Sequence, residues 1–282
     1  MKRPAWLMKV AKGLWFITKL PKKFPIITNI SSIISRLPLI EKILDYTPLK
    51  DDLVFTLPKD QVIQMNQSLE MQGETVLPSQ IVEYFIRKAK HHFIMKVCLC
   101  RYSNDCKDYP KDFGCMFMGD ALLNINTKLG RFVTAEEALD FAEKCREAGL
   151  VHLIGRAYPD RIGLGATPPN KLLTICNCCP CCCGLSIFKH LPAQLGRTYG
   201  KMPGVEVRVH KDKCVGCGTC MKNVCFIDAI QIINKKAAID QSVCRCCGRC
   251  ILACPQEAIE LIISDENFIQ NAINEISSRV EV

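Results

Sequence analysis

The chain has 282 residues, long enough for two domains, and twenty of them are cysteine. Cysteine at this density indicates either a secreted disulfide scaffold or thiolates that bind metal. A secretory signal needs an uninterrupted apolar core, and Lys9, Lys12 and Lys19 interrupt the N-terminal apolar stretch. The sequence therefore predicts a cytoplasmic protein whose thiolates bind metal.

The net charge of +9 is concentrated near the N-terminus. Residues 1–23 hold seven Lys/Arg and no acidic residue, whereas the rest of the chain has 30 basic and 28 acidic residues. A nucleic-acid binder is expected to spread its basic surface through the fold, so no nucleic-acid partner is predicted. Read as a helix, residues 5–20 place Trp6 and Leu14 opposite Lys12. This pattern is typical of helices that lie in a membrane interface.

We predict that residues 1–50 form a basic amphipathic arm, and its role stays open. Residues 1–37 either contact a membrane surface, dock on the protein's own core or a partner subunit, or form a cleaved targeting sequence. No segment qualifies as a membrane span, because the longest uncharged run, Leu172–Phe188, is too short and contains Pro180.

Residues 51–190 read as an α+β domain. Helices are predicted over 78–90 and 134–148, the second one opened by a capping box of Thr134 and Glu137 and stopped by Gly149. The predicted strands are Phe93–Val97, Val151–Ile154 and Leu172–Ile175, with a Gly- and Pro-rich loop over 155–170.

Ten cysteines of this domain gather in two groups, and each group begins where a predicted strand ends. These candidate metal ligands are Cys98, Cys100, Cys106, Cys115, Cys176, Cys178, Cys179, Cys181, Cys182 and Cys183. Neighbouring side chains of an extended chain point opposite ways, so the run 176–183 is expected to face two metal centres, or one centre and a buried surface. Cys145 shares a helix face with Ala138 and Ala142 and is predicted to be a core residue.

The last third of the chain contains a repeat of about 30 residues. Its two units are Cys214-x2-Cys217-x2-Cys220-x4-Cys225 and Cys244-x2-Cys247-x2-Cys250-x3-Cys254-Pro255. Two residues between thiolates let one loop wrap a cube face, so three thiolates of each unit reach three irons of a [4Fe–4S] cluster and the fourth ligand comes from the other unit.

The spacing therefore predicts two [4Fe–4S] clusters in this segment. Cluster 1 takes Cys214, Cys217, Cys220 and Cys254, and cluster 2 takes Cys225, Cys244, Cys247 and Cys250. Structural zinc sites typically pair two CxxC hooks, and this arrangement of eight cysteines argues against them.

In this pattern, residues 202–263 resemble a bacterial-type ferredoxin with two [4Fe–4S] clusters. The resemblance implies a pseudo-two-fold domain with short antiparallel strands and two small helices. The first unit departs from the family in the spacing before Cys225 and in Phe226, where the family has proline. These departures predict a looser fourth ligand or a shifted potential. Cys246 takes the place of Gly216 in the other unit, and we interpret it as an unligated thiol.

The upstream half resembles, in its CxCR, EEAL…AGLVH and CNCCxCCC segments, the upstream domain of uncharacterised 4Fe-4S proteins of anaerobic bacteria and archaea. The resemblance implies a redox protein of an anaerobe. It favours one or two further [4Fe–4S] clusters on the ten upstream cysteines, while zinc or another metal and a thiol or disulfide switch stay open.

The predicted architecture is α+β. It consists of the arm 1–50, a cysteine-rich α+β domain 51–190, a linker 191–203, a dicluster ferredoxin domain 204–265 and a tail 266–282. The predicted function is an electron carrier or accessory subunit of an oxidoreductase, which relays electrons between donor and acceptor proteins and has no catalytic residue of its own. We expect it in the cytoplasm, or peripheral on the cytoplasmic membrane face. The alternatives are an enzyme subunit whose upstream cysteines hold a substrate-binding cluster, and an iron–sulfur redox sensor.

Overall fold

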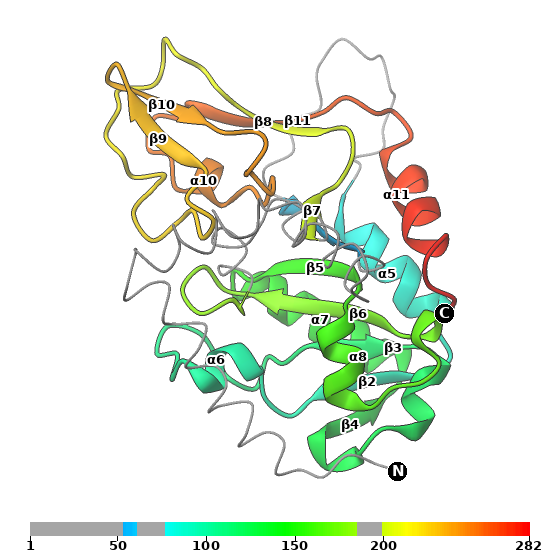
Figure 1. Cartoon of the computed structure of the whole chain (residues 1–282). Coiled ribbons are helices and arrows are strands. Elements are labelled where there is room, and N and C mark those ends of the chain that lie inside the picture. Colours follow the sequence, from blue (N-terminus) through cyan, green and yellow to red (C-terminus); the bar gives the residue numbers. More distant parts are fainter. Residues whose placement is uncertain (1–52, 61–76, 185–198) are drawn as a thin grey trace, which may run out of the picture.

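The computed structural model describes residues 53–60, 77–184 and 199–282. The predicted arm and most of the predicted linker lie outside these residues. Two regions are seen in Figure 1: a large sheet with its helices, and above it the segment that contains the cysteine repeat. We call them the sheet region and the C-terminal repeat (residues 205–263).

The sheet region is built on one seven-stranded sheet with the order β4-β2-β3-β6-β5-β1-β7. All neighbouring strands are antiparallel except β1 and β7, which are parallel. The strands are β1 (Leu53–Thr56), β2 (His92–Met95), β3 (Met116–Met118), β4 (Gly130–Val133), β5 (Val151–Arg156), β6 (Leu173–Cys178) and β7 (Tyr199–Lys201).

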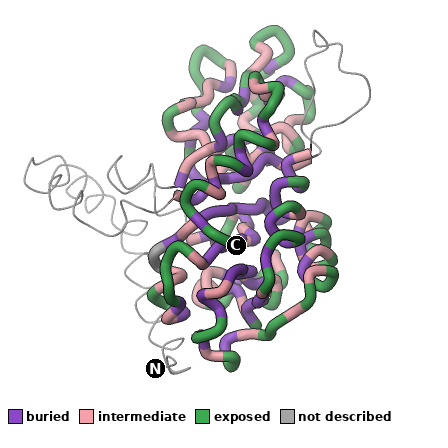
Figure 2. Tube along the Cα trace, turned by 90° about the vertical axis from the view of Figure 1, so that its right-hand side faces the viewer, coloured by how far each residue is buried: buried purple, intermediate pink, exposed green. Residues whose placement is uncertain are grey.

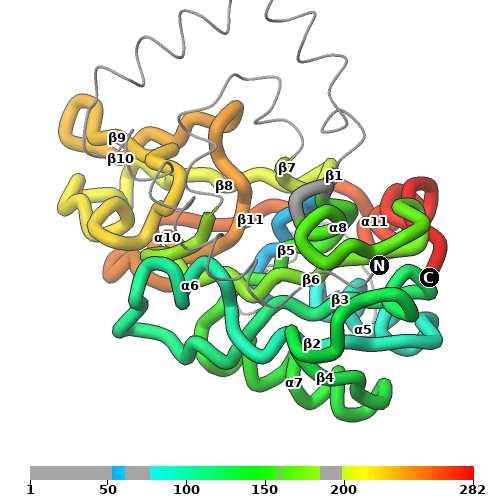
Figure 3. The backbone as a smooth tube through the Cα atoms, turned by 60° about the horizontal axis from the view of Figure 1, so that its bottom comes forward, coloured from blue at the N-terminus to red at the C-terminus, as the bar shows by residue number. Residues whose placement is uncertain are grey.

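Helices cover both faces of this sheet, and Figure 3 shows α7 and α8 on opposite sides of it. On one face, α5 (Ser79–Lys88) and α7 (Ala135–Glu147) bury Phe85 and Ala138 against Ile154 and Ile175. On the other face, Leu164 of α8 (Tyr158–Leu164) packs in a second apolar cluster. The shorter helices of the region are α6 (Leu99–Ser103), η4 (Asp120–Asn124), η5 (Thr127–Leu129) and η6 (Pro169–Lys171).

The capping box predicted at the start of α7 is confirmed. The backbone N–H of Glu137 donates to the Thr134 hydroxyl at 3.2 Å, and the Glu137 carboxylate accepts from the Thr134 N–H at 2.9 Å. Two N–H groups that the helix leaves unpaired are thereby satisfied, which fixes where the helix begins.

Two local predictions in this region are wrong. The segment 155–170 is not a loop throughout, because it contains α8, which has proline in its first turn and ends at Gly165 in the left-handed conformation. Strand β6 does not end before Cys176, because the pairing of Cys176 with Leu153 and of Cys178 with Val151 continues the ladder with β5.

The C-terminal repeat contains two antiparallel pairs. The pairs are β8 (Val205–Val209) with β11 (Ile259–Ile263), and β9 (Ile230–Ile233) with β10 (Lys236–Ile239). Asn234 and Lys235 both have positive φ, which allows the tight two-residue turn between β9 and β10. The only helix assigned within the repeat is α10 (Arg249–Leu252), since the corresponding residues of the first unit, 219–224, form turns.

The two units of the repeat share their unusual backbone positions. Gly218 and Gly248 are both in the left-handed region, with φ of 75° and 81°. Asp228 and Glu257, which also occupy matching positions, have φ of 55° and 47°. The repeat seen in the sequence is therefore also a repeat of backbone conformation.

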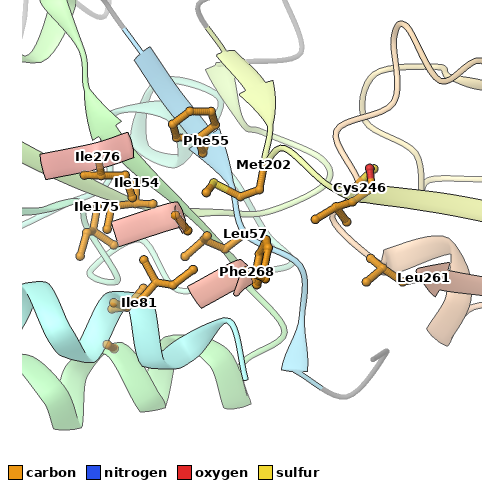
Figure 4. Packing of buried hydrophobic residues seen from close by; sticks show 14 of the residues in the cluster. Phe55, Leu57, Ile81, Ile154, Ile175, Met202, Cys246, Leu261, Phe268 and Ile276 are labelled. Carbon is orange, nitrogen blue, oxygen red and sulfur yellow. The ribbon is translucent and has the colours of Figure 1, made fainter. Parts of the chain in front are cut away.

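One hydrophobic core joins the two regions. It contains Met202, Cys246 and Leu261 together with Phe55 and Ile154 of the sheet (Figure 4). Figure 2 shows buried stretches that continue from one region into the other.

The end of the predicted linker and the predicted tail both belong to this folded unit. Residues 199–201 form β7, and residues 268–277 form α11 (Phe268–Ser277), which runs beside α5 in Figure 1. Phe268 and Ile276 of α11 lie in the shared core (Figure 4).

The predicted α+β class is confirmed. Among the described residues, no helix is both long and apolar enough to cross a bilayer.

Candidate metal centres

The eight cysteines of the C-terminal repeat line two separate cavities. The first is lined by Cys214, Cys217, Cys220 and Cys254. The second is lined by Cys225, Cys244, Cys247 and Cys250. Each cavity thus receives three thiols from one unit and one from the other. These are the two sets that the spacing predicts, and their ligation of a cluster stays a prediction.

Backbone N–H groups point at the sulfur atoms in these cavities. The N–H of Ala229 donates to Cys225 Sγ and that of Ala258 to Cys254 Sγ, both at 3.3 Å, which again relates the two units. Cys214 Sγ accepts from the N–H of Ala237 at 3.3 Å. A [4Fe–4S] cluster is held by cysteine thiolates, and hydrogen bonds to the sulfur atoms tune its reduction potential. The two cavities offer both thiols and amide donors.

The irregular first unit still places Cys225 like its counterpart Cys254. The extra residue before Cys225 is taken up by the turns over 219–224, where Asn223 adopts a φ of 57°. Phe226, at the position where proline is expected, is buried, and its ring centroid lies 5.8 Å from the guanidinium carbon of Arg249.

Cys246 lies outside both cavities. Its side chain is buried in the shared core near Leu261 (Figure 4), and its Sγ lies 3.4 Å from the backbone oxygen of Val205. The hydrogen bond with Cys244 and burial raise the pKa of this thiol. The backbone at Cys246 has a φ of 52°, matching 70° at Gly216 in the other unit. The interpretation of Cys246 as a nearby thiol without a ligand role agrees with this position.

Four of the ten upstream cysteines converge on one point. The Sγ atoms of Cys106, Cys179, Cys181 and Cys182 all lie within 4.8 Å of one another, and those of Cys106 and Cys181 are 3.6 Å apart. We call this the four-thiol group. Its four sulfur ligands match the donor set of either a structural zinc ion or an iron–sulfur cluster.

The other six upstream cysteines form a second, connected set, the six-thiol group. Cys115 Sγ and Cys176 Sγ are 3.5 Å apart. Cys178 interacts with Cys176 and Cys183, each of which lowers its pKa, and Cys98 interacts in the same way with Cys100. The six are Cys98, Cys100, Cys115, Cys176, Cys178 and Cys183.

Two thiols of the six-thiol group, Cys98 and Cys178, have lowered pKa values. The hydrogen bond from Cys100, helped by the charge of Arg101, lowers the pKa of Cys98 to about 7. Hydrogen bonds from Cys176 and Cys183, with the charges of Arg249 and Arg101, hold the pKa of Cys178 well below its usual range. Because the thiolate is the metal ligand, Cys98 and Cys178 are the thiols of this group that most readily become ligands.

The run 176–183 divides its side chains between the two groups. Cys176 and Cys178 lie on one face of β6 with the six-thiol group, whereas Asn177 between them points to the other face. After the strand ends, Cys179 and Cys181 turn to the four-thiol group. The run therefore divides between two groups of thiols, and that these groups are two metal centres stays a prediction.

A fully buried arginine lies between the two upstream groups. The guanidinium of Arg101 donates to the backbone oxygens of Asn177, at 2.8 Å, and Phe113. Interactions with Cys98 of the six-thiol group and with Cys179 of the four-thiol group both raise the pKa of Arg101. A buried cation needs nearby negative charge, which sulfur ligands of a metal on either side would supply.

Cys145 is a core residue, as predicted. It is completely buried beside Leu150, and burial raises the pKa of its thiol to about 12. His152 is also buried, and it makes a hydrogen bond to Asn177.

Comparison with known proteins gives one short similarity of note. Over 48 residues the chain is 48% identical to one component of the ion-translocating oxidoreductase complex of Methanosarcina acetivorans. The match covers 17% of this chain and 18% of that protein. No family model matches the chain, and no solved structure matches it. The similarity and the cysteine groups together support an iron–sulfur protein with an electron-transfer role.

Sequence reasoning missed two arginines, Arg101 and Arg249. The signal for Arg101 was present, since it ends the CxCR segment at residues 98–101. Nothing in the pattern around Arg249 separates it from a surface arginine, because its burial depends on the contact between the two regions.

Proposed function

We propose that this chain is an iron–sulfur relay of an anaerobic redox system, with two [4Fe–4S] clusters in the C-terminal repeat and one or two more on the upstream thiols. The observation that supports it most is the pair of cavities, each lined by one of the two sets of four cysteines that the spacing predicts. A [4Fe–4S] cluster would supply one-electron transfer there.

The chain's own contribution is to hold the sulfur ligands, to donate N–H groups to them and to set their exposure. Cys217 is exposed, and Val215 beside it is 61% exposed, so the first cavity offers a route to a redox partner. Cys247 of the second cavity packs against Val54, Val151 and Leu153 of the sheet.

Redox donor and acceptor proteins are proposed as partners. The name of the similar protein, a component of an oxidoreductase complex, favours a role as one part of a larger assembly. A cytoplasmic location, with docking through residues 1–37 on a membrane surface or a partner, completes the proposal.

The test is the iron and acid-labile sulfide content of the full chain purified without oxygen. We expect about twelve to sixteen irons per chain, of which about eight belong to the C-terminal repeat. The double variant Cys214→Ala/Cys217→Ala should lose about four of them, and the control Cys145→Ala should lose none. Fewer than about six irons in the wild-type chain would refute the proposal.

One observation favours the enzyme alternative as the second candidate. The six-thiol group has two thiols more than the four that a standard cube needs. A centre of unusual composition that binds a small substrate would use them. A change in the electron paramagnetic resonance signal of the upstream centre on adding substrate would distinguish this enzyme from a simple relay.

A further inference from the structure

The C-terminal repeat and the upstream cysteine field pack against the same apolar cluster. Cys247 of the second cavity packs in the same hydrophobic cluster as Cys176 and Cys178 of the six-thiol group. Val151 and Leu153 of β5 belong to the same cluster. We call this contact the seam. It places a predicted ligand of cluster 2 and two thiols of a different candidate centre against the same apolar residues.

Arg249 of α10 lies in the seam. Its side chain is buried, at 8% exposure, and its guanidinium donates a hydrogen bond to the backbone oxygen of Cys178. Its charge acts on Cys178 and on Cys247, and its Nη1 is buried without a hydrogen-bond partner in the part of the chain that the structure describes. One guanidinium therefore faces both candidate centres.

The other charged and titratable groups around Arg249 do not neutralise it. The charge of Arg249 acts to lower the pKa of both Lys59 and Tyr109. For Lys59, burial is the larger cause of the lowered pKa. No carboxylate forms an ion pair with Arg249 among the residues described. A buried cation without a carboxylate needs another source of negative charge, and the sulfur ligands of the two proposed centres would supply it.

We propose that Arg249 is a charged bridge that raises the reduction potentials of both centres it faces, cluster 2 and the centre on the six-thiol group. Each reduction adds one negative charge to a centre, and a buried cation nearby stabilises that charge because the surroundings screen it weakly. The inference rests on the proposed function, since it requires clusters at both places.

The test is a potentiometric titration of the full chain with dithionite as the one-electron source, followed by electron paramagnetic resonance. Signals are assigned by their loss in Cys247→Ala and in Cys178→Ala. Arg249→Met and Arg249→Gln remove the charge, and Gln keeps a donor for the Cys178 oxygen if the Met variant assembles poorly. Arg249→Lys restores the charge.

We expect unchanged iron content, a shift of both midpoint potentials to more negative values in the neutral variants, and recovery of both in Arg249→Lys. Two arginines of the same repeat serve as controls. Arg208→Met should shift neither signal, because Arg208 is exposed and pairs with Glu206. Arg245→Met should shift the midpoint potential of cluster 2 alone, because Arg245 interacts with Cys244 and Cys246.

A shift of only one signal, or of neither, in Arg249→Gln would overturn the charged bridge. So would a Lys variant that behaves like the neutral ones. A wild-type chain without cluster signals would instead refute the proposed function, and this is known before any Arg249 variant is made.

Discussion

His152 donates a hydrogen bond from its Nδ1 to the Oδ1 of Asn177, over 2.8 Å. The direction is fixed by the amide, because its Nδ2 donates to the backbone oxygen of Gly114 at 2.8 Å and its Oδ1 is the acceptor. The other ring nitrogen, Nε2, is buried without a partner among the described residues. Burial, followed by the charge of Arg146, lowers the pKa of His152 to about 4.

This pair predicts a loss of stability in mild acid. The pKa of His152 is lower in the folded chain than the ordinary value of 6.5, so the unfolded chain binds more protons as the pH falls below 6.5. The free energy of unfolding should therefore fall by about 1.4 kcal/mol between pH 7.5 and 5.5 on account of this group alone.

Urea unfolding at the two pH values, without oxygen, measures this loss. The variant His152→Gln keeps a donor for Asn177 and does not titrate. Between pH 7.5 and 5.5 the free energy of unfolding of this variant should fall by about 1.4 kcal/mol less than that of the wild-type chain. An equal pH dependence in both proteins would show that His152 is protonated normally in the folded chain.

The neighbouring thiols Cys246 and Cys247 predict opposite outcomes on substitution. Cys247 lines the second cavity, whereas Cys246 points into the shared core. Cys247→Ala should lose about four irons per chain, and Cys246→Ala should lose none. Iron and sulfide analysis of the two variants measures the difference. Iron loss in both, with unchanged folding by circular dichroism, would mean that Cys246 is a ligand.

The part of the candidate site that follows from local spacing could be predicted from the sequence. The eight cysteines of the repeat sort into two sets because short loops can present three thiols to one cube, and this depends on a few neighbouring residues. The helix that begins at Thr134 is equally local, since its capping box spans only four residues.

The remainder depends on contacts between distant segments. Which upstream thiols meet is decided by the antiparallel pairing of β3 with β6, which places Cys115 beside Cys176. The buried position of Arg249 likewise requires the seam. Both need the three-dimensional arrangement, for which the spacing of cysteines in the sequence gives no information.

The division of the upstream thiols predicts that two centres can be removed separately. Cys181 belongs to the four-thiol group and Cys183 to the six-thiol group, although they lie close together in the sequence. Cys181→Ala should abolish one upstream electron paramagnetic resonance signal, or one equivalent of zinc, and leave the other centre in place. Cys183→Ala should do the reverse. Loss of all upstream metal in each variant would indicate a single centre that includes both groups.

The packing of α11 predicts that the last helix is needed for stability. Phe268 is 2% exposed and lies in the core that joins the sheet region to the C-terminal repeat (Figure 4). Phe268→Ala should therefore lower the free energy of unfolding by about 3–5 kcal/mol, because it removes a large buried side chain and leaves a cavity. Leu123→Ala is a suitable control, since Leu123 is 60% exposed and its truncation should cost less than about 0.5 kcal/mol. Urea unfolding without oxygen measures both. A small loss in Phe268→Ala would mean that residues 266–282 are a tail that the fold does not require, because the core would then hold without them.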